Sequence, residues 1–276
     1  MSINDKSITH EQVIPVVESR LFEDHPTARF AIGILAVEDV VVPGLENEYQ
    51  GYFDLRRNVY VEQTGQLHPS ELNEEGKDHD ADDARSVAFG IIENRIVDQR
   101  VVAATRLIIK GFGSDEQKDA SLPIESFCPD IFGDNPAPNG SLEVSRLIAR
   151  HEKARMQDVL RSQIYAASLA YIDGHNLGPT YGVIEPWLQR FLQATIPVEP
   201  IGEARYVEHY LDYNVPIRVD TEAFVNQMNT THPGAIATMQ QNEGSMTYFG
   251  KAQLARRVQN VIPLQPERHN ADEVSA

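Results

Sequence analysis

Residues 142–149 read Leu-Glu-Val-Ser-Arg-Leu-Ile-Ala, an apolar, strand-like run that carries a carboxylate at Glu143 and a guanidinium at Arg146. Charged side chains are almost never fully buried in proteins unless they are paired. Elsewhere the chain supplies four candidate partners: Arg56, Asp80, Asp83 and Arg106. An apolar strand with charges that need partners indicates a buried polar site, which we interpret as an active site.

The bulk composition limits the classes of function that the chain can have. Its 276 residues are enough for one large domain or two small ones, and 41% hydrophobic and 24% charged residues are ordinary for a soluble globular protein. The formal net charge is −17, and a surface of that sign repels nucleic acids and anionic membranes. We therefore expect neither nucleic-acid binding nor attachment to an anionic membrane.

Targeting and cysteine signals are few. The N-terminus has no basic segment followed by an apolar run, and no stretch approaches the ~20 apolar residues of a membrane span. These features predict a cytoplasmic protein without a signal peptide or membrane span. The single cysteine, Cys128, excludes an intramolecular disulfide and a thiolate metal cluster. We expect it to be a buried structural residue, with a nucleophilic role as the alternative.

Two arginines lie on faces that should point inward. Residues 46–62 have helical periodicity, with Arg56 and Tyr60 on the apolar face. Residues 100–110 alternate as a strand, which places Arg106 among apolar side chains. An arginine in such a position must find a carboxylate, bind an anionic ligand or extend its head to water.

The remaining elements follow from the same periodicities. The sequence predicts further strands at 29–37, 86–92, 142–149 and 180–184, more β-structure at 197–207 and 217–219, helices at 9–21, 151–173, 185–194 and near 252–258, and a helical turn near 124–127. The strands at 86–92 and 100–110 are expected to pair antiparallel. This mixed order predicts an α/β (α+β) fold, a central sheet flanked by helices. We expect one domain over 1–225, with an N-terminal helical extension, and a C-terminal appendage at 226–276.

The segment 64–84 is an acidic, turn-rich loop, and most of its carboxylates are expected to be solvated. Alternate aspartates that begin at Asp78 resemble the start of a calcium-binding loop. However, Asp83 stands where that loop needs glycine, and Phe89 stands where it needs the bidentate glutamate. Because no His-Glu-x-x-His or comparable ligand set occurs either, we predict no metal site.

Several of these segments together resemble a known family. They include an Arg followed by an aromatic residue at 55–60, an Asp-x-x-Asp pair at 80–83, a strand arginine at 104–107, a Phe-containing segment at 122–132, Glu-x-Ser-Arg at 143–146, and a strand followed by a helix at 183–192. In order and spacing they resemble the acyl-homoserine-lactone synthases, or autoinducer synthases, a branch of the GNAT acyltransferase superfamily. The resemblance covers about residues 50–220.

The resemblance implies a GNAT-like, mostly antiparallel central sheet in which the parallel strands at 142–149 and 180–184 splay into a V-shaped cleft. It also implies an enzyme, an N-acyltransferase. The acyl donor would be a phosphopantetheine thioester, either acyl-CoA or an acyl carrier protein, and the acceptor a small-molecule amine such as an amino acid. Two alternatives stay open: a true acyl-homoserine-lactone synthase that uses S-adenosylmethionine, and a GNAT-like binding module without catalysis.

The same resemblance suggests roles for the charged residues. Glu143 would be the base that removes the amine proton, directly or through a water molecule, with Arg106 beside it. The residues expected to bind the acceptor are Arg56, Tyr60, Asp80 and Asp83. The residues expected to bind the donor are Arg146, Arg150, Lys153 and Arg155, the last three near the start of a helix, where phosphates are bound favourably. A structural ion-pair network without catalysis is the alternative for the arginines and Glu143.

Three details qualify this assignment. Strand alternation places Arg146 on the face opposite Glu143, unless a β-bulge turns it. The family's tryptophan on the S-adenosylmethionine side of the pocket would fall at Gln66, which puts a homoserine-lactone product in doubt. An acidic acyl carrier protein would need a local basic patch, for which the candidates are Arg146, Arg150, Lys153, Arg155 and Arg161; without that patch, acyl-CoA is the expected donor.

Overall fold

The structure, a computed structural model, describes residue 22 and residues 27–95, 98–193, 196–231 and 246–249. The helices predicted at 9–21 and near 252–258 lie outside these residues. Within the described residues, none of the helices combines the length and apolarity that crossing a membrane requires.

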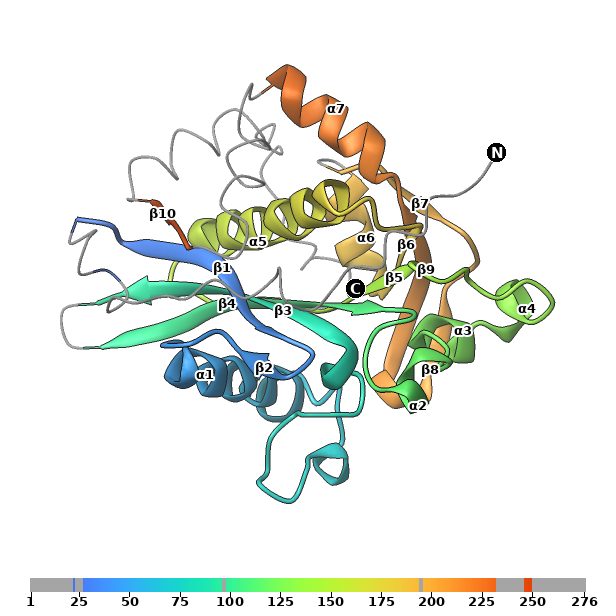
Figure 1. The fold of residues 1–276 in the computed structure, drawn as a ribbon, viewed down its shortest axis with the longest axis horizontal. Helices are drawn as coiled ribbons and strands as arrows, with labels where there is room; N and C mark the ends of the chain where they lie inside the picture. The colour runs from blue at the N-terminus through green and yellow to red at the C-terminus, as the bar shows by residue number, and fades with distance from the viewer. Residues whose placement is uncertain (1–21, 23–26, 96–97, 194–195, 232–245, 250–276) are drawn as a thin grey trace, which may run out of the picture.

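A single large sheet runs through the molecule (Figure 1). Its strands, in spatial order, are β10 (Thr247–Phe249), β1 (Phe30–Val37), β3 (Ser86–Asn94), β4 (Gln99–Ile109), β5 (Leu142–Ala149), β6 (Thr180–Ile184), β9 (Asp212–Val219) and β7 (Val198–Pro200). Two short strands pair at its sides: β2 (Val40–Val41) with β1, and β8 (Arg205–Val207) with β9. Neighbouring strands are antiparallel except β5 and β6, which are parallel. The predicted mixed, mostly antiparallel sheet is confirmed.

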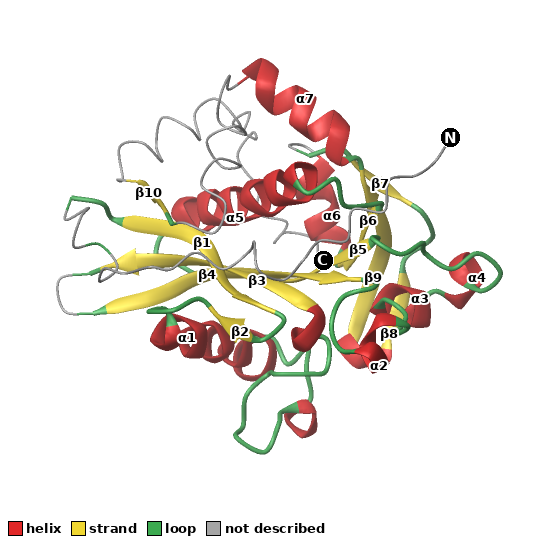
Figure 2. Cartoon of the chain, viewed as in Figure 1, coloured by secondary structure: helices red, strands yellow, loops and turns green. Residues whose placement is uncertain are grey.

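Helices cover both faces of this sheet (Figure 2). The longer helices are α1 (Glu46–Arg57) on one face, α5 (Ala154–Gly174) on the other, α7 (Thr221–Thr231) packed on α5, and α6 (Pro186–Gln193) beside β7 and β9. The shorter ones are α2 (Asp115–Lys118), α3 (Pro123–Phe127) and α4 (Pro129–Phe132), with 3-10 turns at Pro69–Glu71, Asp83–Arg85 and Glu208–Tyr210. The layered arrangement leaves the centre of the sheet protected on both sides.

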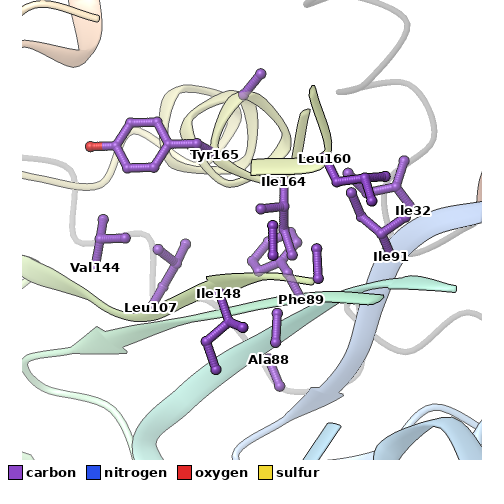
Figure 3. Packing of buried hydrophobic residues seen from close by; sticks show 14 of the residues in the cluster. Ile32, Ala88, Phe89, Ile91, Leu107, Val144, Ile148, Leu160, Ile164 and Tyr165 are labelled. Atoms are coloured by element: carbon purple, nitrogen blue, oxygen red, sulfur yellow. The ribbon is translucent and has the colours of Figure 1, made fainter. Parts of the chain in front are cut away.

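The core between α5 and the sheet follows from the two side-chain periodicities. Leu160 and Ile164 lie one helical turn apart on α5 and face the sheet, and Leu107 of β4 points from the sheet to the side that α5 covers (Figure 3). All three are fully buried, and burying such a side chain stabilises the fold by about 1.5–3 kcal/mol. Because strand side chains alternate, Arg106 lies on the opposite face of β4, the face that α1 covers. The core packing of Leu107 therefore fixes the direction of Arg106.

The helix α1 does not end at Arg57 but widens into a π-helical segment, Asn58–Gln63. The amide of Thr64 donates to the carbonyl of Val59 at 3.0 Å, five residues back. Together the two segments account for the helix predicted at 46–62. A π-helical turn is rare and frequently marks a functional site, and Tyr60 lies on this one.

Some elements differ from the sequence-based expectation. Strand β9 begins at Asp212 rather than at 217, because a polar start and Pro216 hide its strand pattern. The helix α7 was not predicted. Of the segment 226–276, the structure describes the end of α7 and β10, and β10 pairs with β1 at the edge of the sheet. Cys128 is fully buried, as predicted.

Candidate active site

The strands β5 and β6 separate soon after they begin. They pair only through Leu142 with Thr180 and Glu143 with Tyr181, whereas β5 continues to Ala149. A cavity of about 700 Å³ opens between them. It is lined by residues 143–150, by 183–185 with Trp187 and Leu188, by the first turns of α5, by members of the segment 59–66, and by Tyr210 and Asn214. The predicted gap between the two strands is therefore a cavity that reaches from the sheet to both helical layers.

Beside this cavity, three arginines and three aspartates form a cluster that is buried except for Asp80, whose side chain is 32% exposed. Asp78 accepts bidentate hydrogen bonds from Arg56 (3.0 and 3.2 Å) and from Arg146 (2.9 and 3.2 Å). Arg106 makes a bidentate pair with Asp80 (2.6 and 2.8 Å). These pairs tie the acidic loop to α1, β4 and β5.

The third aspartate of the cluster closes the network. Asp83 Oδ1 accepts from Arg56 at 2.6 Å and lies 3.0 Å from Arg106, while its Oδ2 accepts from the amide of Asp80 at 2.9 Å. Each carboxylate oxygen of the three aspartates thus has a donor. With three positive and three negative side chains, the cluster is neutral overall.

The electrostatics of the cluster favour its charged state. Burial by itself would raise the pKa of Asp78, but Arg56 and Arg146 outweigh it and hold that pKa well below its usual range. In the same way Arg106 holds the pKa of Asp80 well below its usual range despite burial. These carboxylates are anionic at any physiological pH, so they are pairing groups and not bases.

A β-bulge brings Arg146 into this cluster. Arg106 pairs with Ser145, whereas Ala104 pairs with Ile148, so β5 has one more residue than β4 between these two positions. Arg146 takes the left-handed conformation there, with φ of 54°. The extra residue turns its side chain to the α1 face, where the guanidinium lies 5.2 Å from the ring centre of Tyr60. The bulge therefore overrides the alternation that placed Arg146 on the other face.

Glu143 lies in the same cavity with a different environment. It is 1% exposed, and the amide of Ile124 donates to its Oε2 at 2.7 Å. Burial raises the pKa of Glu143 to about 8, although the bond from Ile124 and the charge of Arg106 lower it. Arg106 pairs with Ser145, which lies two residues after Glu143 on the same face of β5. The ion pairs of Arg106 are with Asp80 and Asp83.

The predicted donor-binding residues divide into two groups. Arg150 lines the cavity, and its Nε is buried without a hydrogen-bond partner. Lys153 and Arg155 are exposed at the start of α5 and do not line the cavity. Arg161 does line it, paired with Asp158 at 3.0 Å. The structure thus joins Arg150 and Arg161 to the cavity and leaves the other two on the surface.

Sequence reasoning missed several residues of the site. No local signal separates Asp78 from its solvated neighbours, yet it is the carboxylate that joins α1 to β5. Tyr52, in contrast, was predictable from helical spacing, because it lies one turn before Arg56 on the same face of the helix. Its hydroxyl accepts a hydrogen bond from the Arg56 guanidinium at 3.1 Å. Tyr210 belongs to a 3-10 turn that is distant in the sequence, and it lines the cavity. The centre of its ring lies 5.8 Å from the guanidinium carbon of Arg146.

Among the described residues, no group of three or more His, Cys, Asp or Glu side chains has an arrangement that could hold a metal ion. Gln66, which stands where the family has tryptophan, donates from its Nε2 to Glu185 Oε1 at 2.7 Å. Both residues line the cavity, so the position is polar here.

Comparisons with known proteins place this geometry in a fold family. No protein-family model matches the sequence, and no curated protein sequence matches it. Among solved structures, TofI in a ternary complex with an inhibitor and MTA is similar with a TM-score of 0.52 at 17% identity, over 75% of this chain and 98% of that one. FeeM, an N-acyl amino acid synthase from uncultured soil microbes, gives 0.50 at 13% identity, over 73% and 96%. The acyl-homoserine-lactone synthase LasI gives 0.50 at 11% identity, over 70% and 91%.

Such identities establish similarity of fold and not of substrate. The matches nevertheless span 91–98% of each of these solved chains. The chain therefore shares the fold of TofI, FeeM and LasI, a mixed and mostly antiparallel sheet between helices, as its sequence motifs predicted.

Proposed function

We propose that the protein is an N-acyltransferase that moves an acyl group from a phosphopantetheine thioester to a small-molecule amine. The observation that carries this proposal is Glu143. It is a buried carboxyl group in the wall of the cavity between β5 and β6, and burial raises its pKa to about 8. A base with a pKa near the working pH is best suited to proton transfer, and perturbed groups of this kind cluster at functional sites.

The cavity suits an extended thioester donor. Its volume of about 700 Å³ lies within the range of small-molecule sites, about 300–1,000 Å³. Where β6 separates from β5, an acyl-pantetheine arm would lie along the part of β5 that β6 does not pair. Arg150 and the amides at the start of α5 would face the phosphates, while Arg146 would remain part of the cleft wall. Lys153 and Arg155, on the surface, would meet outer phosphates of CoA or an acidic carrier protein.

The reaction would be aminolysis of the thioester. The acceptor nitrogen attacks the carbonyl carbon, a C–N bond forms, and the C–S bond breaks to release a thiolate, which takes up the proton that the nitrogen gives to Glu143. The nitrogen loses a proton to Glu143, directly or through a water molecule. The cluster of Arg56, Arg106, Asp80 and Asp83, with Tyr60 against Arg146, would form the rigid wall of the acceptor pocket.

The test is transfer itself. Purified protein is incubated with acyl-CoA and acyl carrier protein donors of several chain lengths and with a panel of amino acids and other amines, and products are identified by mass spectrometry. Glu143→Gln keeps the size of the side chain and an acceptor for the Ile124 amide, so the variant should fold and lose about 100-fold or more in turnover. The matched control is Glu75→Gln, an exposed loop residue, which should retain full activity. Full activity in Glu143→Gln would refute the assignment of the base.

A true acyl-homoserine-lactone synthase is the second candidate, favoured by the same fold. The same assay with S-adenosylmethionine as acceptor separates the two, because only that enzyme releases a lactone. Gln66, bonded to Glu185, argues against it, since the resemblance predicts tryptophan at this position. A GNAT-like binding module would bind a thioester in calorimetry but give no product with any amine.

A further inference from the structure

The short helix α3 contacts the two central strands of the sheet through two consecutive residues. The amide of Ile124 donates to Glu143 of β5 at 2.7 Å. The carboxylate of Glu125 accepts from the ammonium of Lys110, directly after β4, at 2.8 and 3.0 Å. Glu143 pairs with Ile108, two residues before Lys110, so the side chains of Glu143 and Lys110 lie on the same face of the sheet. The helix is therefore held on this face at two neighbouring points.

The hydrogen bonds around α3 converge on Glu125. Besides the bonds from Lys110, its carboxylate accepts from the amide of Leu122 at 2.6 Å and from the amide of Ala137 at 2.8 Å. The Glu125 side chain is only 6% exposed. Burial by itself would raise the pKa of Glu125, but Lys110 and the two amides outweigh it and lower that pKa. Glu125 is therefore an anionic acceptor that joins both ends of the segment 122–137 to the end of β4.

The amide that follows from this arrangement acts directly on Glu143. A hydrogen bond donated to a carboxylate favours its charged form. Burial raises the pKa of Glu143, and the bond from Ile124 opposes that effect. Because Ile124 and Glu125 are neighbours in the same helical turn, a displacement of Glu125 also moves the Ile124 amide.

Five other groups face Glu143 from the elements around it, and a substitution of Glu125 leaves all of them in place. They are Asp82, Arg85, Arg106, Cys128 and Tyr210. Beyond the effect of burial, the aspartate raises the pKa of Glu143, whereas the two arginines lower it. Burial raises the pKa of the thiol and of the phenol, and the charge of Glu143 raises both further. A change in the pKa of Glu143 on substitution of Glu125 therefore reports on the Ile124 amide and on the charge of Glu125 itself.

We propose that Glu125, paired with Lys110, is a positioning residue that holds the Ile124 amide against the Glu143 carboxylate and thereby sets the pH range in which this base works. The inference rests on the proposed N-acyltransferase function, in which Glu143 takes the proton of the amine. Glu125 does not line the cavity, so it acts on the reaction through Ile124 and not by contact with a substrate.

The direction of the shift in Glu125→Gln separates positioning from a simple charge effect. Removal of a negative charge near Glu143 would by itself lower the pKa of Glu143. Glutamine has one acceptor oxygen instead of two and makes no ion pair with Lys110, so α3 should move and the bond from Ile124 should weaken, which raises that pKa. A hydrogen bond to a charged group corresponds to about one pKa unit or more, and we expect a rise of about one unit.

The pH dependence of kcat/KM, with an acceptor amine that is neutral throughout, measures this shift. For a base with a pKa of about 8, a rise of one unit lowers the ionised fraction about tenfold at pH 7 but only about twofold at pH 9. We expect the activity of Glu125→Gln to fall by these two factors, whereas a purely structural defect would lower it equally at both pH values. The matched control Glu116→Gln, at an exposed position of α2, should keep the unmodified profile.

A second variant covers the case in which Glu125→Gln does not fold, as judged by circular dichroism. Glu125→Asp keeps the charge and withdraws the carboxylate by one methylene group, so it should shift the pH profile in the same direction by a smaller amount. A midpoint that is unchanged or lower in folded Glu125→Gln would overturn the proposal. If only Glu125→Asp folds, an unchanged midpoint in that variant would overturn it.

NMR titration of the Glu143 carboxyl carbon separates this inference from the proposed reaction. Protein with isotope-labelled glutamate gives this resonance, which is assigned by its loss in Glu143→Gln. If no acyl transfer is found but Glu125→Gln raises the pKa of Glu143, the positioning role stands and the acyltransferase assignment fails. If transfer occurs and that pKa is unchanged or lower in Glu125→Gln, the acyltransferase assignment stands and the positioning role is refuted.

Discussion

The carboxyl group of Glu143 should make the folded protein less stable as the pH rises, and glutamine at this position should remove that loss. The unperturbed pKa of a glutamate is 4.5, and burial raises that of Glu143 to about 8. A group whose pKa is higher in the folded state contributes stability that is fully present below the unfolded pKa and is lost as the pH rises through the folded pKa. Stability should therefore fall between about pH 4.5 and pH 8.

The size of the effect follows from the same shift. One pKa unit corresponds to about 1.4 kcal/mol, so the upper limit of the loss is about 5 kcal/mol above pH 8, and about 3 kcal/mol at pH 7. Water that enters the cavity beside Glu143 lowers both figures. Glutamine is neutral at every pH and its carbonyl can still accept from the Ile124 amide, so Glu143→Gln should be the more stable protein at high pH and about equal to the unmodified one near pH 5.

Urea unfolding of both proteins near pH 5 and near pH 8.5 measures this difference. The free energy of unfolding should favour Glu143→Gln by about 2 kcal/mol or more at the higher pH, while the exposed-site control Glu75→Gln should follow the unmodified protein. Equal stabilities of Glu143→Gln and the unmodified protein at both pH values would show that the carboxyl group is not desolvated, and the argument for it as the base would fail with it.

Three further outcomes are expected. Asp78→Asn leaves Arg56 and Arg146 without their shared buried carboxylate, so it should lower the free energy of unfolding by about 3–5 kcal/mol. Urea unfolding measures this change, and a loss below about 1 kcal/mol would contradict the structural role of the cluster. Gly90→Ala would bring a Cβ to 2.6 Å from a Leu35 methyl group and should cost about 1–3 kcal/mol; an unchanged thermal midpoint would argue against this strand register. With an acceptor amine that is neutral throughout, kcat/KM should rise with pH and level off above about pH 8 as the base ionises; a flat profile would exclude the buried carboxyl group as the base.

The strands at the centre of the site were predictable because their signals are local. β5 and β6 have the predicted bounds, since each is an apolar run preceded by glycine or proline. Arg56 was correctly placed on the inward face of its helix, because helical spacing alone determines which residues share a face. The existence of a buried charged cluster followed from these placements, since inward arginines require anionic partners.

What the sequence could not reveal depends on contacts between distant segments. Nothing around Arg146 signals the bulge, because the extra residue exists only relative to the pairing of β5 with β4. Asp78 resembles its solvated neighbours, and only the folded loop brings it between two arginines. Gln66 and Glu185 are joined by one hydrogen bond across the cavity, and no periodicity relates the two positions.

The buried cluster is better explained by geometry than by stability. Buried ion pairs contribute little net stability compared with apolar residues of similar volume, and the left-handed conformation of Arg146 costs about 1–3 kcal/mol. The bidentate pair with Asp78 offsets that cost and fixes the bulge. The bulge lies in the part of β5 that β6 no longer pairs, so it holds the strand in the shape that leaves the cavity open. On this view the acidic loop, by binding Arg146, maintains the cavity that Glu143 lines.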